Sequence, residues 1–536
     1  MAQFKKAFEW LLIAISCFTI GILVYSFYLR FSINMPLGAY EDYFGQMVDR
    51  LRQGKPLYSH PTLEYIPLIY APLYAYLSSL FIWGDLSYTS MRWVSQISLF
   101  ISIVLLFQMP NIISGEKDSK KKISNYKLGI VLCGLLTASY PLSGYWLDLA
   151  KVDSLLILLL TGIIFFYYQA WNEINATKCN IYLLLLGISS ALLPFVKQNF
   201  LILLPILIFF LFLKYNIKKT MAVLLIQISV ISLIVIRELL IPDNHFFYYI
   251  FVLPGLHPFT EKGFFLELIR VLAPVSLLAG ILIYSYSITE MKKDFRAILK
   301  HKLSFLFILA VTVFILGFVA RFKQGAVVNS LLYPYILLLI LNFAILAEFK
   351  SLSARLQITS FLFFLIQFLT IWHNPMNDFQ IWKSMQSDQV VYKDSFCKMP
   401  KQIYLEDFSF QRKLFCQQED FFINYGVIDI MSSERLMKPI IEVYSDALRQ
   451  KHFQRIITAN FEALQNADFL YTSTQAHYLK KPNVRNHSFM KVMEMKVLQN
   501  QHYVLIQKEE LSENESIFVN IHNKYYRPVQ LYRPKD

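Results

Sequence analysis

The sequence predicts a polytopic α-helical membrane protein that carries a small C-terminal α/β domain. Of its 536 residues, 56% are hydrophobic and only 16% are charged, whereas soluble domains average about 25% charged residues. Apolar runs of about 17–23 residues recur along the chain, long enough to cross a hydrocarbon layer of about 30 Å. After Asn374 these runs stop, and charged and amide side chains become frequent.

Eleven apolar runs are candidate membrane spans. The first, 8–29, is too long for a cleavable signal and no small-x-small cleavage site follows it. The expected spans lie near residues 9–30, 88–113, 128–147, 154–171, 181–196, 199–214, 221–241, 266–288, 303–320, 331–347 and 357–373. The membrane module is therefore expected to cover 1–373.

The distribution of basic residues orients the chain. A net charge of +14 would suit a nucleic-acid-binding protein. The lysines, however, gather in short loops between spans, as in "GEKDSKKKISNYK" and "TEMKKDFRAILKHK". Such loops stay on the cytoplasmic side of a membrane. The N-terminus is then cytoplasmic, eleven crossings leave residues 374–536 outside, and no nucleic-acid partner is expected.

The most elaborate polar segment follows the first span. In "GAYEDYFGQMVDRLRQG" the adjacent carboxylates Glu41 and Asp42 open an amphipathic helix pattern. The aromatic stretch Leu68–Trp83 comes next, and we interpret it as a re-entrant or interfacial helix, where Tyr and Trp are favoured. A full crossing there would place the basic cluster Lys120–Lys122 outside.

The outer region 374–536 is long enough for one small domain. The pieces at 453–461, 489–498 and 502–509 alternate like strands, and 437–453 has a helical pattern. Cys397 and Cys416 are the only two cysteines in this region, which lies in a compartment that permits oxidation. We expect them to form a disulfide.

Ionisable residues cluster at the outer ends of the spans. Each alone has a simpler explanation, as a snorkelling anchor or a loop charge; together they place carboxylates and cations at one depth. Carboxylates can act as general bases, and cations stabilise a leaving phosphate. Sugar transfer from a polyprenyl-phosphate donor uses both. The candidates are Glu41, Asp42, Asp148, Lys151, Asp153, Lys197, Arg237, Asp243, His245, His257, Arg321 and Lys323.

Several motifs, in order, resemble one family. An acidic pair precedes "DRLRQG"; "YAPLYAYL" matches a proline-aromatic helix; "AKVDSLL" and "FVKQN" match elements that open and end later spans; "YYIFVLPGLHPF" matches a long outer loop with histidine. Across roughly residues 10–375 the chain resembles GT-C polyprenyl-phosphate-sugar-dependent glycosyltransferases, of the protein O-mannosyltransferase-like and lipid A aminoarabinose transferase-like branch.

The resemblance implies an inverting transfer on the outer face of a bacterial cytoplasmic membrane, from a polyprenyl-phosphate sugar to a glycan, lipid or protein. It implies that Glu41 or Asp42 is the base, with Glu41 slightly favoured, and that Asp153 is a second acidic group. Lys197 would bind the donor phosphate; Arg321, Lys323 and His257 are further phosphate candidates, chosen by position.

The sequence also departs from the family. Tyr40 stands where relatives carry an aspartate, and Tyr70 and Ala71 stand where some carry a lysine. A capping role for Glu41 or Asp42 at the helix start is the simpler alternative. No cofactor is required, although two carboxylates can bind a divalent cation.

Two other classes of protein remain open. A transporter or flippase of lipid-linked sugars should show internal repeats or Gly/Pro-broken helices in matching halves, and the sequence shows neither. In a non-catalytic envelope assembly protein the outer domain would be the functional part. Eleven spans are more than such a domain needs for anchorage.

Overall fold

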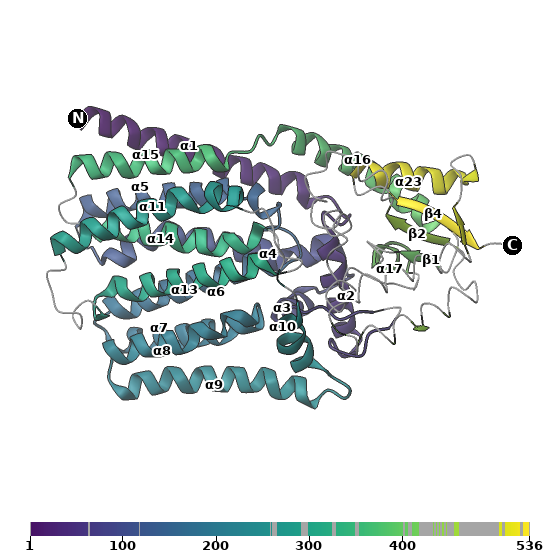
Figure 1. Ribbon diagram of the computed structural model, residues 1–536, viewed down its shortest axis with the longest axis horizontal. Helices are drawn as coiled ribbons and strands as arrows, with labels where there is room; N and C mark the ends of the chain where they lie inside the picture. The colour runs from purple at the N-terminus through teal and green to yellow at the C-terminus, as the bar shows by residue number, and fades with distance from the viewer. Residues whose placement is uncertain are drawn as a thin grey trace.

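The computed structural model has a helical bundle at one end and a small sheet at the other, with short helices between them (Figure 1). The structure describes residues 2–62, 65–116, 118–257, 259, 265–290, 299–323, 328–348, 353–399, 403–405, 410–417, 433, 436, 439, 442–443, 446, 455–459, 503–505, 510–525 and 529–534.

Eight helices of the described chain are long and apolar enough to cross a membrane. A ninth span is counted if α15 (Ala354–Ile371) and α16 (Met376–Cys397), which meet at a bend of 46°, are taken as one. The most buried of the eight is α14, whereas α9 lies at the edge of the bundle (Figure 1). The eight are α1 (Ala2–Phe31), α4 (Tyr88–Ser114), α6 (Asp153–Asn172), α7 (Ala176–Leu192), α9 (Ile217–Leu240), α11 (Phe265–Glu290), α13 (Lys302–Phe322) and α14 (Leu332–Glu348).

Two of the eleven expected spans are not among these nine. The span expected at 128–147 is helix α5 (Ser119–Ala138), which begins where the Asp118 side chain caps the Lys120 N–H at 2.9 Å. It ends before Pro141, whose ring cannot continue a helix, and the residues after Ala138 form a buried loop instead. The span expected at 199–214 is a 3₁₀ turn, Gln198–Ile202, followed by α8 (Leu203–Lys214), about 18 Å long.

Short helices lie between the bundle and the sheet. Helix α2 (Ala39–Arg52) carries the acidic pair in its first turn, and α3 (Leu73–Phe81) follows it. At nine residues, α3 is about 14 Å long and cannot cross a membrane, which agrees with an interfacial position for this segment. Helix α10 (Leu253–Leu256) and the π-turn Tyr248–Val252 lie at the same level (Figure 1).

The C-terminal sheet has four strands in the order β1-β2-β4-β3. Its first pair is parallel and the other two pairs are antiparallel. Strands β2 and β3 confirm the strands expected at 453–461 and 502–509. The strand expected at 489–498 lies outside the described residues, as does most of the helix expected at 437–453. The domain boundary at 373/374 stays a prediction. The elements are β1 (Ile403–Leu405), α17 (Phe410–Cys416), β2 (Arg455–Ala459), β3 (Tyr503–Leu505), α23 (Glu513–Tyr525) and β4 (Val529–Pro534).

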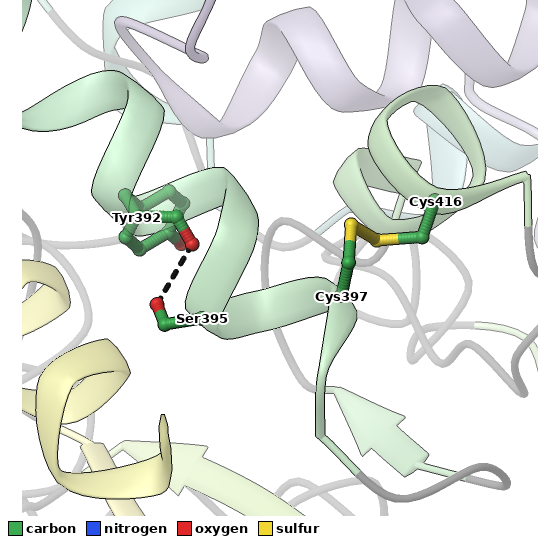
Figure 2. Close-up of a disulfide and its surroundings, with 4 residues drawn as sticks. All are labelled: Tyr392, Ser395, Cys397 and Cys416. Atoms are coloured by element: carbon green, nitrogen blue, oxygen red, sulfur yellow. Dashed lines mark hydrogen bonds between the residues drawn. A yellow bond between two sulfur atoms is a disulfide. The ribbon is translucent and has the colours of Figure 1, made fainter. Parts of the chain in front are cut away.

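A disulfide between Cys397 and Cys416 joins the end of α16 to the end of α17, as predicted (Figure 2). Helix α17 in turn contacts α2 through an ion pair of 2.7 Å between Lys413 and Asp49. The Phe415 ring lies 6.1 Å from that of Tyr88 at the start of α4. The disulfide therefore joins α16 to a helix that itself contacts α2, which carries the acidic pair, and α4.

Loss of this disulfide should destabilise the C-terminal region. In the chain-entropy model, a bridge that closes a loop of this length contributes roughly 3 kcal/mol. Cys397→Ser is therefore expected to lower the melting temperature of the purified protein, and reductant should lower that of the wild type but not of the variant. Cys17→Ser, at an exposed free thiol, is the control. Equal melting temperatures for the wild type and Cys397→Ser would contradict this role.

The N-terminus, next to Lys5 and Lys6, and the C-terminal sheet lie at opposite ends of the bundle (Figure 1). By the charge rule the basic end is cytoplasmic. Reporter fusions after Lys122 and after Asp378 should therefore report opposite sides of the membrane, the second one outside. Both fusions on the same side would contradict this orientation.

Candidate active site

The acidic pair begins with Glu41, whose carboxylate is fully buried against Arg92 of α4. The guanidinium binds it in a bidentate manner, with both N···O distances 2.7 Å. The N–H groups of Leu37 and Ala150 donate to the same two oxygens at 2.7 and 3.0 Å. These four donors fill the lone-pair positions of a carboxylate.

Arg92 is satisfied equally completely. Its remaining N–H groups donate to the carbonyls of Arg30, Ile33 and Met35, at 3.3, 2.6 and 2.7 Å. All five donors of a guanidinium are thus used. The pair joins α2, α4, the segment after α1 and the loop before α6, and it has no capacity left to take a proton from a substrate.

Asp42, the second acid, is held differently. It is also fully buried, and it accepts a hydrogen bond from the Tyr88 hydroxyl. Neighbouring residues on a helix point about 100° apart, so Asp42 does not share the environment of Glu41. The acid that the sequence slightly favours as the base, Glu41, is thus the one bound to Arg92.

The loop 145–152 connects the acidic pair to a second group of ionisable residues. Asp148 forms an ion pair with Arg30 at 2.8 Å and accepts from Tyr140 at 2.7 Å. Burial raises the pKa of Asp148, and Arg30 opposes that shift. The Lys151 carbonyl accepts from Ser95 at 2.9 Å. This loop is therefore fixed on one side to α1 and on the other to α4.

Asp153, at the start of α6, is the centre of the second group. It lies 3.8 Å from the Lys151 ammonium and 3.6 Å from that of Lys197. It accepts from the Tyr333 hydroxyl and from Asn329 at 3.1 Å, and Lys197 donates to Tyr333 at 2.8 Å. The structure thus brings together the predicted Asp153, Lys151 and Lys197; we call these residues, with Asn329 and Tyr333, the Asp153 cluster.

Burial controls the charge of the two lysines. It lowers the pKa of Lys151 well below the ordinary value and lowers that of Lys197, and Asp153 opposes both shifts. Of the three charged side chains, that of Lys197 is 18% exposed, against 1% for Lys151 and 0% for Asp153. Lys197 is therefore the member of the cluster that a ligand would contact first. An anion bound there would favour the charged form of both amines.

The other predicted phosphate ligands form a separate group around the chain segments 253–259 and 321–323. Arg321 is paired with Glu267 at 2.6 Å, and Lys323 donates to the Pro254 carbonyl at 2.8 Å. His257, at the end of α10, is buried. Arg321 and Lys323 are thus held by Glu267 and the Pro254 carbonyl rather than by members of the Asp153 cluster.

The outer end of α9 holds three more of the candidates. Arg237 contacts the hydroxyl of Tyr76 in α3 and lies 2.9 Å from Glu238, a buried carboxylate that also accepts from Asn244 at 2.7 Å. The rings of His245 and His60 are 4.2 Å apart. Asp243 is exposed in the turn after α9, with a positive φ of 54°. These contacts fasten α9 to the short helices.

Sequence reasoning missed Arg92, Tyr88, Asn329 and Tyr333. Arg92 had a signal, because an arginine inside an apolar span is costly and indicates a partner. The tyrosines and Asn329 had none, because nothing in their spacing relates them to an acid elsewhere in the chain.

No group of three or more Asp, Glu, His or Cys side chains that could hold a metal ion occurs among the described residues. The oxygens of Glu41 are already occupied by N–H donors. Glu41 and Asp42 therefore do not form a two-carboxylate site.

The fold and these buried ion pairs define a multi-span membrane protein with its polar chemistry gathered at one end of the bundle. Neither a protein-family profile nor a curated protein sequence matches the chain. Solved structures do. ArnT from Cupriavidus metallidurans bound to undecaprenyl phosphate aligns with a TM-score of 0.53 at 8% identity, covering 84% of this chain and 94% of that one.

Two further structures are similar. The apo state of the same ArnT aligns with a TM-score of 0.53 at 8% identity, over 85% of this chain and 94% of that one. The Archaeoglobus fulgidus oligosaccharyltransferase aligns with a TM-score of 0.47 at 10% identity, over 86% and 70%. The ArnT alignments show that the chain shares the fold of ArnT, in agreement with the resemblance in the sequence, and at this identity they show the fold alone.

Breaking the Glu41–Arg92 pair should unfold the outer end of the bundle. Removal of one partner of a buried ion pair typically costs about 3–5 kcal/mol, because the other charge stays buried. Arg92→Lys cannot reproduce the bidentate geometry and Glu41→Gln removes the charge. Both are expected to reduce the yield of monodisperse protein in size-exclusion chromatography. Glu173→Gln, at the opposite end of the bundle, should leave it unchanged. A wild-type yield and melting temperature for both variants would contradict this structural role.

Proposed function

We propose that this protein is a glycosyltransferase of the bacterial cytoplasmic membrane that moves a sugar from a polyprenyl-phosphate donor to an acceptor on the outer face. The observation that carries the proposal is the connection of two buried polar groups through one loop. Ala150 of loop 145–152 donates to Glu41, the neighbour of the buried Asp42, and Lys151 of the same loop lies 3.8 Å from Asp153. The similarity in fold to ArnT, which was solved with undecaprenyl phosphate, supports it.

Asp42 is proposed as the general base. It would take the proton of the acceptor hydroxyl as that oxygen attacks the anomeric carbon. The bond between the anomeric carbon and the phosphate oxygen breaks, and polyprenyl phosphate leaves with the electron pair. Attack from the face opposite the phosphate inverts the anomeric configuration. Because Asp42 is buried, an acceptor reaches it only after the side chains over it move.

The Asp153 cluster is proposed as the donor phosphate site. Two lysines stand against one carboxylate, so an anion would complete the charge balance when both amines are protonated. Lys197 would contact the phosphate directly, since its side chain is the most exposed of the three, and a compact ammonium suits a single phosphate. Asp153 and Tyr333 would orient the Lys197 ammonium.

Removal of the Asp42 charge tests the base. Asp42→Asn keeps the shape but cannot accept a proton, so transfer should slow by about 10²–10⁴-fold with folding preserved. The assay is transfer of radiolabelled sugar from a polyprenyl-phosphate donor by the purified enzyme, and Asp85→Asn, an exposed carboxylate after α3, is the control.

Near wild-type turnover in Asp42→Asn would rule out this role. Turnover that is retained in Asp42→Asn but lost in a correctly folded Glu41→Gln would instead assign the base to Glu41. Flipping of labelled donor across proteoliposome membranes without any transfer product would identify a flippase.

Replacement of Lys197 tests the donor site. Lys197→Ala should weaken binding of undecaprenyl phosphate by roughly tenfold, since a charge-assisted hydrogen bond contributes about 1.5–3 kcal/mol. Lys178→Ala, an exposed lysine at the other end of the bundle, should have no effect. Isothermal titration in detergent measures both. Equal affinity of Lys197→Ala and wild type would contradict the assignment.

The affinity for donor phosphate should also depend on pH. In the free protein burial lowers the pKa of Lys151 and Lys197, and a bound phosphate raises both. Between the free and bound pKa values, binding takes up a proton. The dissociation constant should therefore rise as pH increases above 7, by at most about tenfold per pH unit for each proton. Lys197→Arg stays charged and should reduce the slope. A dissociation constant unchanged between pH 7 and 10 would contradict this coupling.

A further inference from the structure

A cavity of about 450 Å³ opens between the end of α1, the first half of α4 and helix α16. It is separate from the contacts of Asp42 and of the Asp153 cluster. Three aromatic side chains and three uncharged polar ones line it. We call it the α1–α4 groove, and its lining is Phe27, Tyr28, Phe31, Ser32, Gln96 and Gln386.

Two glutamine side chains in the groove have hydrogen-bonding groups available for a ligand. Gln386 donates both amide hydrogens within the protein, to the Leu29 carbonyl at 2.5 Å and to Ser32 at 2.7 Å. Its carbonyl oxygen has no hydrogen-bond partner among the described residues. The amide of Gln96 has none there either, although it lies about two turns inside a membrane-length helix. An amide at this depth favours a ligand that supplies hydrogen bonds.

The aromatic side chains form the wall of the groove. Tyr28 is 73% exposed, and Phe31 packs edge-on against Trp93 with ring centroids 5.4 Å apart. Exposed rings at the end of a span lie at the membrane interface. Aromatic faces pack against the C–H faces of a sugar ring, while its hydroxyls can both donate to and accept from amides.

The lining also disfavours other ligands. The described residues around the cavity carry no charged side chain, so a phosphate headgroup would have no counter-charge. A bare acyl chain would leave the Gln96 amide and the Gln386 carbonyl oxygen without hydrogen bonds. A volume of this order is in the range of small-molecule sites.

We propose that the α1–α4 groove binds the uncharged sugar headgroup of a membrane glycolipid, whose acyl chains stay in the outer leaflet beside α1 and α4. Arg92 lies one turn before Gln96 on α4, and the carbonyl of Ile33, next to Ser32, accepts from Arg92. The bound headgroup therefore lies behind the Glu41–Arg92 pair. The inference is independent of the proposed transferase activity, because binding needs no donor.

Native mass spectrometry of the full chain in detergent tests the proposal. The probe is monoglucosyl-diacylglycerol, compared with diacylglycerol and phosphatidylglycerol of the same acyl chains. One molecule of the glucolipid should bind per chain, about tenfold tighter than either comparison lipid. Gln96→Leu and Tyr28→Leu should each weaken it by about five- to tenfold, and Ile97→Leu, on the neighbouring lipid-exposed face, should not.

Each other result overturns the proposal. Equal binding of diacylglycerol means that only acyl chains occupy the groove, and tighter binding of phosphatidylglycerol means that an anionic headgroup does. If Gln96→Leu folds poorly, the glucolipid affinity of Tyr28→Leu, at an exposed position, tests the proposal instead. Gln96→Asn is expected to retain part of the affinity. Asp42→Asn should bind the glucolipid like wild type, so a failure of the transferase proposal and a failure of this one are distinguishable.

Discussion

The ion pair between Glu41 and Arg92 is the constraint on which the outer end of this protein depends. Both side chains are fully buried, and every donor of the guanidinium and every acceptor position of the carboxylate is used within the protein. Burying two charges is costly and is repaid only when geometry and hydrogen bonding are complete. The pair meets that condition, and it fixes four segments of the chain at one point.

This constraint separates the roles of two neighbouring acids. Glu41 is held by N–H donors, and Asp42 accepts a hydrogen bond from the phenol of Tyr88. Loop 145–152 connects the Glu41–Arg92 pair to the Asp153 cluster, because Ala150 donates to Glu41 and Lys151 lies beside Asp153. The position of the Asp153 cluster relative to α2 thus follows from the same buried pair.

The C-terminal region is part of this arrangement rather than an appendage. The disulfide joins α17 to α16, the Lys413–Asp49 ion pair joins α17 to α2, and Phe415 packs near the tyrosine that donates to Asp42. Gln386 of α16 completes the α1–α4 groove. Both the proposed base and the proposed glycolipid groove are therefore bordered by residues that follow the last membrane helix in the chain.

The sequence by itself determined the features that local physics decides. Apolar length predicts the spans, lysine placement predicts their alternation, and the only two cysteines in one oxidising region predict the disulfide. The candidate acids and Lys197 were also identifiable from motifs. Only the tertiary structure decided that Glu41 is saturated by Arg92, that Asp42 meets Tyr88, and that Asp153 lies between Lys151 and Lys197. Hydrogen bonds between residues 46 to 180 positions apart leave no periodic trace in a sequence, because they depend on how the helices pack.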